Sequence, residues 1–298
     1  MGEVVNRTSF IRPYRMAVVA VNHIEDDFRS SESSRFRGSQ SRNLTCLFAK
    51  LCSIIPRMMA HIIYENENSK TLLAAQNLDD LDAIYREGKS ARLRHAGRAV
   101  WKKIVRDSDV DEKTLYVKMH WGKHRLVPRF SELRQRQAYR SMPQREWQGN
   151  ELFRKIGLNV AERCAVLNDG LWNFRSAMIM KAVPPEKCID EMLQDGSWNE
   201  IDEERRELLL DTMIATLEKI HAANLNWKGA TSRHFFPEWD ENQGWELWLI
   251  DCEGARRGCN DRMQERDFRK FYRSMEESGA DEKTLKMLRE KIDKLERS

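Results

Sequence analysis

The sequence lacks the features of several protein classes. Its six cysteines are scattered over 298 residues, with no CxxC and no other paired spacing. Zinc sites need clustered ligands and secreted disulfide scaffolds are usually short, so neither is supported and we expect reduced thiols. No stretch approaches the roughly 20 apolar residues of a membrane span. We therefore expect a cytoplasmic protein, with peripheral contact at the cytoplasmic membrane face left open.

A strong excess of one charge is also missing. The 51 Lys and Arg stand against 47 Asp and Glu, a net charge of +4, and residues 1–57 hold this whole excess. A protein that coats DNA or RNA needs a basic body for its phosphate contacts. Residues 58–298 are neutral on paper, so we expect no nucleic acid partner. The hydrophobic share of 41% is enough for a folded core.

Residues 1–57 differ from the rest in composition. Residues 29–41 contain six Ser in thirteen positions, too little apolar surface to fold alone. Met58 and Met59 stand just before the patterned region. We predict that residues 1–57 are either disordered or not part of the true chain.

The remaining residues carry two kinds of pattern. In the first part, β-rich or alternating runs predict antiparallel strands, and apolar spacing predicts helices. The strands are expected at 91–105, 114–119, 160–167 and 173–183, and the helices at 78–87 and 134–156. After Pro184-Pro185, which breaks any regular element, helices predominate. These are expected at 186–193, 203–223 and 267–290, around one strand at 245–250. The order predicts an α+β protein with a small β lobe (70–183) and a mainly helical lobe (184–298).

Three charged residues occupy positions that suit chemistry. Lys118 lies within an apolar strand pattern, Glu146 lies on the charged helix, and Asp251 ends a strand before a Gly-containing turn. Each has a plain structural alternative: a packed Lys stem whose amine reaches water, a solvated carboxylate and a turn cap. Their order, however, is the one that phosphoryl transfer uses. A Lys held by a Glu contacts nucleotide phosphates, and an Asp holds magnesium.

With these residues in this order, the chain resembles the lipopolysaccharide kinase family. Members of that family have a two-lobed, protein-kinase-like fold and phosphorylate heptose or 3-deoxy-manno-octulosonic acid of the lipopolysaccharide inner core. The resemblance covers roughly residues 85–275. The matching runs are Tyr116-Val117-Lys118, Arg145-Glu146-Trp147-Gln148, Gly157-Leu158-Asn159-Val160, Ile220-His221-Ala222-Ala223, Arg233-His234-Phe235-Phe236, residues 249–257 and Arg266-Asp267-Phe268-Arg269.

The resemblance implies roles for these residues and implies ATP and Mg²⁺ as cofactors. According to this resemblance, Lys118 would contact the phosphates, Glu146 would anchor Lys118, and Asp251 would bind magnesium. His234 falls where other kinases place a metal-binding Asn, and the family has His there too. His221 also matches a family His; for it we favour a packed histidine that bonds the following loop.

One position departs from the family pattern. Where the family has His-Arg-Asp in its catalytic loop, this chain has Trp227-Lys228-Gly229. Gly229 therefore stands in place of the presumed base, and Lys228 is able only to stabilise charge. The glycine-rich cover is reduced to Ala96-Gly97. We expect Gly229→Asp to raise turnover, provided that the backbone there does not need a positive φ.

Three functions follow as hypotheses. The first is an ATP-dependent kinase, weakened by the missing Asp, that phosphorylates a lipopolysaccharide-type core sugar at the inner membrane face. The second is a pseudokinase that serves as a binding module, favoured by Gly229. The third is a small-molecule phosphotransferase with another acceptor. Lys118, Glu146 and Asp251 favour the first and the third.

Overall fold

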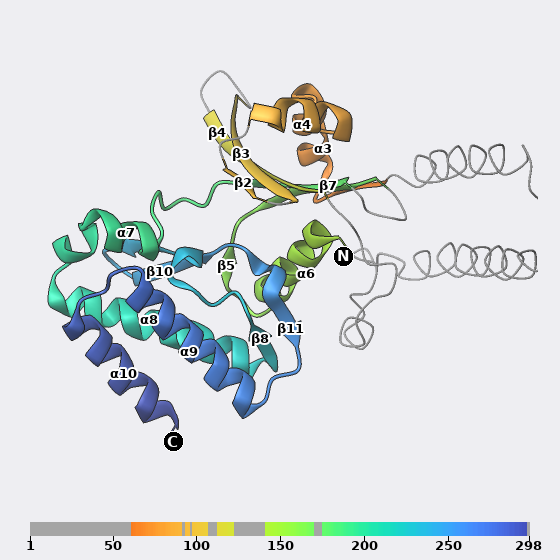
Figure 1. Ribbon diagram of the computed structural model, residues 1–298. Helices are drawn as coiled ribbons and strands as arrows, with labels where there is room; N and C mark the ends of the chain where they lie inside the picture. The colour runs from red at the N-terminus through yellow and green to blue at the C-terminus, as the bar shows by residue number, and fades with distance from the viewer. Residues whose placement is uncertain are drawn as a thin grey trace, which may run out of the picture. The chain divides into compact units, whose positions relative to one another are not determined.

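A six-stranded antiparallel sheet supports one half of the protein (Figure 1). The computed structural model describes residues 61–90, 93–95, 97–106, 112–121, 141–169 and 175–296. The predictions for residues 1–57, and for the beginning of the 134–156 helix, lie outside these residues. The strands pair in the order β1-β6-β7-β4-β3-β2. Their bounds are β1 His61–Tyr64, β2 Leu93–His95, β3 Arg98–Arg106, β4 Glu112–Trp121, β6 Arg163–Asn168 and β7 Arg175–Lys181.

The central strands β6 and β7 are covered on both faces. All six residues of β6 are buried, and so are the inner five of β7. The apolar runs Cys164–Leu167 and Ala177–Met180 within them are typical of such two-sided burial. Helices α3 (Glu67–Ala75) and α4 (Leu81–Glu87) pack with them in one hydrophobic cluster, which includes Leu73, Ile84, Leu167 and Ile179. The sequence patterns predicted α4 but neither α3 nor the short β1.

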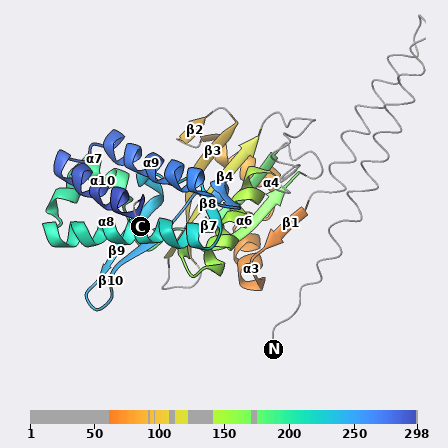
Figure 2. The same ribbon diagram turned by 90° about the horizontal axis from the view of Figure 1, so that it is seen from below.

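The other half is built around the long helix α8 (Glu203–Ala222), which begins at the N-cap Asp202. The helix predicted at 203–223 is confirmed, and its apolar spacing forms a stripe in which Leu209, Met213, Leu217 and Ile220 are fully buried. Figure 2 shows the helices of this half gathered on one side and the sheet with α3 and α4 on the other. The elements around α8 are α7 Ile189–Asp195, β5 Asn159–Val160, β8 Leu225–Trp227, β9 Phe235–Asp240, β10 Gly244–Leu249, β11 Ala255–Arg257, α9 Asp261–Glu277 and α10 Glu282–Glu296.

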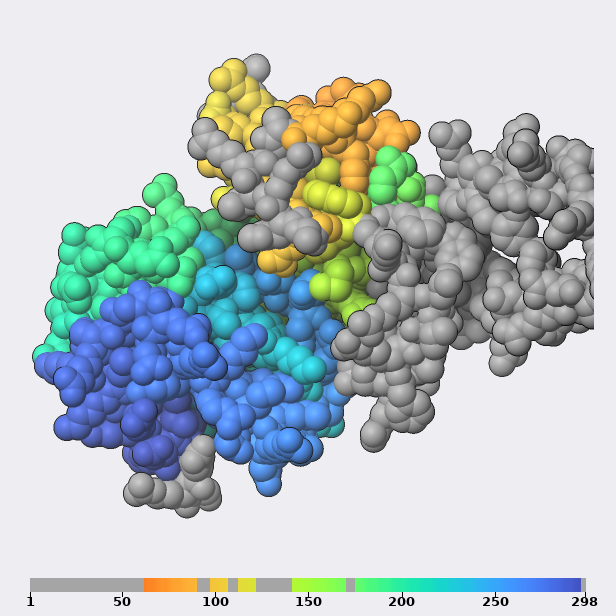
Figure 3. Space-filling view, viewed as in Figure 1, coloured from red at the N-terminus to blue at the C-terminus, as the bar shows by residue number. Residues whose placement is uncertain are grey.

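Helix α6 (Met142–Lys155) lies between the two halves. A capping box fixes its beginning, because the Ser141 hydroxyl accepts from the Gln144 backbone N–H and the Gln144 side chain accepts from the Ser141 N–H. The helix packs on β4, β6 and β7 of the sheet and on the 3₁₀ turn Cys252–Gly254 of the other half. A helix in this position can hold a side chain against both halves. In the space-filling view of Figure 3 the two halves form adjoining masses.

Three predicted elements are each divided in the structure. The segment 91–105 is not one strand but the antiparallel pair β2 and β3. The segment 160–167 is not one strand: β5 pairs in parallel with β10, whereas β6 joins the large sheet. The segment 267–290 is two helices, since the chain turns at Gly279, whose φ of +93° ends the helical path. The boundaries of the two lobes stay a prediction. Among the described residues, no helix is long and apolar enough to cross a membrane.

Candidate active site

Lys118 on β4 and Glu146 on α6 form an ion pair between the two halves. The Lys118 Nζ lies 2.5 Å from Glu146 Oε1, and the two side chains are 15% and 3% exposed. Burial alone would lower the pKa of Lys118, but the carboxylates of Glu146 and Asp251 outweigh it and raise that pKa. Lys118 is therefore a fixed cation. The second carboxylate oxygen of Glu146 is buried and has no hydrogen-bond partner among the described residues.

Gly149 allows α6 to come this close. A Cβ at Gly149 would lie 1.8 Å from the backbone oxygen of Cys252, so only glycine fits here. Gly149 follows Glu146 by three residues, which puts both on one face of the helix. The same close approach that brings α6 onto the turn after Asp251 thus delivers the Glu146 carboxylate to Lys118.

Asp251 stands at the end of β10 in an unusual backbone conformation. Its φ and ψ of 54° and 51° are left-handed, a region in which Asp and Asn are the most frequent residues after Gly. Its carboxylate lies 3.9 Å from Lys118 Nζ and 3.3 Å from His234 Nε2. Burial would raise the pKa of Asp251, but Lys118 and His234 outweigh it, and the pKa is held well below its usual range. Asp251 is a carboxylate at every physiological pH.

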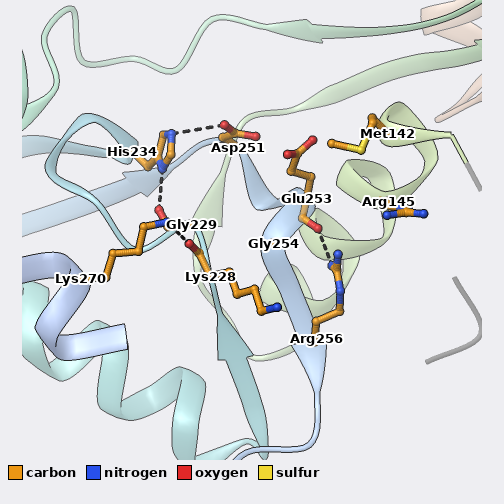
Figure 4. A pocket seen from close by; sticks show the side chains of 10 residues that line it. All are labelled: Met142, Arg145, Lys228, Gly229, His234, Asp251, Glu253, Gly254, Arg256 and Lys270. Atoms are coloured by element: carbon orange, nitrogen blue, oxygen red, sulfur yellow. Dashed lines mark hydrogen bonds and ion pairs between the residues drawn. The ribbon is translucent and has the colours of Figure 1, made fainter. Parts of the chain in front are cut away.

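His234 bridges Asp251 and the loop that carries Gly229 (Figure 4). Its Nδ1 lies 2.5 Å from the carbonyl oxygen of Gly229 and 2.9 Å from Thr231 Oγ1. A carbonyl only accepts, so Nδ1 carries the proton. A metal-binding His is commonly held in this way, by an N–H donated to a backbone carbonyl. A protonated Nε2 donates to the Asp251 carboxylate, which is how His234 lowers the pKa of Asp251, and an Nε2 without a proton is able to share a cation with that carboxylate.

Three carboxylates gather at one point of the site. Ligand oxygens of Glu146, Asp251 and Glu253 all lie within 4.8 Å of one another. Burial, followed by the charges of Asp251 and Glu146, raises the pKa of Glu253 to about 7. Clustered carboxylate oxygens that repel one another are the donor set that a divalent cation such as Mg²⁺ takes. The residues present therefore fit the magnesium ion that kinases of this type use.

Gly229 lies in the same pocket as Asp251 and His234, as its predicted place in the loop requires. The pocket has a volume of about 270 Å³. Its lining residues are Met142, Arg145, Lys228, Gly229, His234, Asp251, Glu253, Gly254, Arg256 and Lys270. In Figure 4 the Lys228 side chain points away from His234 and Asp251. Lys228 thus reaches the pocket from the side opposite these two residues.

The expectation that Gly229→Asp raises turnover needs correction. The φ of Gly229 is not positive, so the stated proviso is met. However, a Cβ at Gly229 would lie 2.4 Å from the indole Nε1 of Trp227. Trp227 is fully buried and packs edge-on against Phe153 at a centroid distance of 5.3 Å, so its ring has little room to move. The side chain of an Asp at 229 does not fit beside this Trp.

His221 is a packed histidine whose side chain bonds helix α9, while only its backbone carbonyl accepts from the following loop, from Asn224 N–H at 2.8 Å. Its Nε2 lies 3.4 Å from the carboxylate of Asp267 on α9. Asp267 is fully buried and also accepts from the backbone N–H of Trp227, at 2.7 Å. Asp267, which belongs to a matching run but had no expected role, therefore fixes the backbone at Trp227, where the loop begins. His221 acts behind it and does not line the pocket.

The sequence analysis missed Glu253 and Lys270 as pocket residues. Glu253 follows Asp251 by two residues within the matching run 249–257. Two carboxylates on either side of a turn were therefore a signal present in the sequence. Lys270 lies on α9, and its ammonium donates to the carbonyl of Lys228. No local pattern connects residue 270 with residue 228, since only the packing of α9 on the loop brings them together.

Comparisons with known proteins show the family and the fold of this chain. The model of the lipopolysaccharide kinase (Kdo/WaaP) family matches residues 79–291. Among the solved structures, the chain is similar to one described as WaaP in complex with acyl carrier protein, with a TM-score of 0.53 and 16% identity over 76% of this chain and 86% of the other. No curated protein matches the sequence significantly. The predicted α+β, protein-kinase-like fold is confirmed.

Proposed function

Because the chain belongs to the lipopolysaccharide kinase (Kdo/WaaP) family, we propose that it transfers the terminal phosphoryl group of ATP to a sugar of a lipopolysaccharide-type inner core. The acceptor is heptose or 3-deoxy-manno-octulosonic acid. The observation that carries this proposal is the meeting of Lys118 and Glu146 with Asp251, which lines the pocket. Three residues from distant parts of the chain supply the cation and the carboxylates that phosphoryl transfer needs.

Each of these side chains has a separate task. Lys118, kept charged by its neighbours, binds nucleotide phosphate oxygens, and Glu146 fixes the direction of its ammonium group. Asp251 and Glu253, with His234 beside them, hold Mg²⁺. When bound, the ion neutralises charge on the transferred phosphoryl group. In this proposal Lys118 approaches the phosphates from the sheet and Asp251 from the opposite half.

The loop side of the pocket supports transfer less well. No side chain at Gly229 can take the acceptor proton or orient its hydroxyl. A general base typically contributes about 10² to 10⁴ in rate. Phosphoryl transfer depends mainly on positioning and charge neutralisation, which Lys118 and the carboxylates provide without a base. We therefore expect transfer that is slow but measurable, at the cytoplasmic membrane face where the acceptor is built.

A pseudokinase is the second candidate, and Trp227 is the observation that favours it. Its buried ring fills the space that a side chain at 229 would need. A loop packed in this way is consistent with a protein that binds nucleotide and performs no chemistry.

The test combines binding with transfer. Thermal shift of the full chain with ATP, measured with and without Mg²⁺, tests the nucleotide site, and phosphate transfer to a panel of inner-core sugars tests the activity. Lys118→Met should reduce both, whereas the exposed Lys155→Met on α6 should change neither. Magnesium-dependent ATP binding without transfer to any sugar would support the pseudokinase. Failure to bind ATP at all would contradict the proposal.

A further inference from the structure

The hairpin between β2 and β3 is too short to cover a phosphate chain. His95 pairs with Arg98, so only two residues connect the strands. Gly97 occupies this turn with a φ of +85°, and its carbonyl accepts from the Trp121 N–H at the end of β4. A glycine-rich kinase loop of the G-x-G-x-x-G type covers the phosphates with a longer segment of backbone. A two-residue turn tied to β4 cannot do this, so another group has to bind the phosphates from the sheet.

Arg98, the first residue of β3, lies on the face of the sheet that carries Lys118. It pairs directly with His120 of β4, and paired residues of antiparallel strands project to the same face. His120 follows Lys118 by two residues, which again places both on one face. Arg98, His120 and Lys118 therefore share the face that points toward the carboxylates.

The charge of Arg98 acts on two groups of this face and of the site. Burial, then the charges of Lys118 and Arg98, lower the pKa of His120 to about 4. Burial raises the pKa of Asp251, whereas Lys118, His234 and then the charge of Arg98 lower it. Yet the structure gives the side chain of Arg98 no hydrogen bond or ion pair within the part of the chain that it describes, and the residue is exposed. An exposed guanidinium so close to the site, with neutral His120 beside it, can bind an anion.

We propose that Arg98 binds the terminal phosphate of the nucleotide from the sheet side, in place of the missing loop amides. This inference rests on the proposed function. A guanidinium presents two parallel N–H donors that match two phosphate oxygens, and it keeps its charge at every physiological pH. Lys118 supplies the second cation on the same face. Arg98 thereby makes the site selective for a triphosphate over a diphosphate.

The experiment measures Mg²⁺-dependent binding of a non-hydrolysable ATP analogue and of ADP to the full chain by calorimetry. Arg98→Met should weaken binding of the analogue by about 10- to 100-fold, the loss of a charge-assisted contact, and that of ADP by less than about 3-fold. Arg98→Lys should fall between. The control is Arg106→Met, at the other end of β3, where Arg106 is exposed and pairs with Glu112; it should bind both nucleotides like the parent.

Two results overturn the inference alone. If the parent prefers the analogue and Arg98→Met binds it equally well, Arg98 does not touch the phosphate. If Arg98→Met loses both nucleotides equally, the contact is not with the terminal phosphate. A parent chain that binds neither nucleotide contradicts both the proposed function and the role of Arg98. The side chain of Arg98 has no described hydrogen-bond or ion-pair partner. The melting temperature of Arg98→Met without nucleotide should therefore equal that of the parent, which shows that the fold is intact.

Discussion

The site has a carboxylate side (Asp251 and Glu253, with Glu146 and Lys118 beside them) and a loop side (Lys228 and Gly229, with Trp227 buried behind them), and the two are held differently. On the carboxylate side Lys118 is held by Glu146 and Asp251, while burial and mutual repulsion raise the pKa of Glu146 and Glu253. On the loop side the backbone is fixed, by the Asp267 carboxylate and by the packing of Trp227, while the position nearest Asp251 carries no side chain. Under the proposed function, the carboxylate side supplies charged groups for phosphates and a metal ion, whereas the loop side supplies no group for the acceptor proton.

The difference shows that the two sides can change independently. Lys118, Glu146 and Asp251 depend on one another electrostatically, so loss of one disturbs the other two. The lack of a side chain at Gly229 is linked mainly to Trp227, because the indole ring occupies the space that a side chain at 229 would need. A chain can therefore lose the loop carboxylate and keep its nucleotide site. The following predictions test this separation, beginning with the largest expected effect.

Asp251→Asn should remove transfer activity and magnesium-dependent ATP binding. Asn tolerates the left-handed backbone of this position, so the fold should remain. Loss of the carboxylate should lower the rate by about 10³-fold or more, because metal stabilisation of a transferred phosphoryl group is worth several kcal/mol. Steady-state kinetics and thermal shift with Mg²⁺-ATP measure the effect. Asp261→Asn, an exposed residue at the start of α9, is the control; equal losses in both variants would contradict the assignment.

Gly149→Ala should destabilise the protein and damage the carboxylate side from a distance. The new Cβ would meet the Cys252 carbonyl at 1.8 Å, so α6 must move and take Glu146 away from Lys118. We expect a loss of about 3 kcal/mol in the free energy of unfolding, the upper range for overpacking, together with weaker ATP binding. Urea unfolding and calorimetry test this. A fully stable variant with parent affinity would show that α6 does not need this close approach.

Gly229→Asp should cost about 1–3 kcal/mol of stability and should not raise turnover, because its Cβ collides with Trp227. Trp227→His alone should also destabilise, since it leaves a cavity in the core. If the two side chains compete for one space, the double variant should lose less stability than the sum of the single changes. Strictly additive losses, measured by urea unfolding, would show that they do not. A gain in turnover by Gly229→Asp alone would show that the loop relaxes.

Glu253→Gln should change how stability depends on pH in the absence of metal. The pKa of Glu253 is about 7 in the folded protein and about 4.3 in an unfolded chain. Between these values the folded state binds the proton more tightly, so stability falls as pH rises through this range. The variant should lose this fall, a difference of about 1–2 kcal/mol between pH 5 and pH 7.5 for a partly exposed group. Urea unfolding with a chelator measures it, and the exposed Glu204→Gln should behave like the parent.

Much of the fold was predictable from local patterns. The stripe of α8, the strand that carries Lys118 and the break at Pro184-Pro185 are properties of consecutive residues, which a pattern of period 3.6 or 2 reveals. The division of 160–167 into β5 and β6 was not predictable in this way. Both pieces have the same apolar character, and only the choice of partner, β10 or β1, assigns them to different sheets.

The sequence by itself determined the identities and the order of the site residues: a Lys on a strand, a Glu on a helix, an Asp after a strand, and a Gly where a carboxylate was expected. Only the tertiary structure decided which of them meet. The 2.5 Å contact of Lys118 with Glu146 depends on the missing Cβ of Gly149, and the space at Gly229 depends on the ring of Trp227. The physical reason is that close packing between elements is set by atoms from distant segments, and no local pattern of residues contains that information.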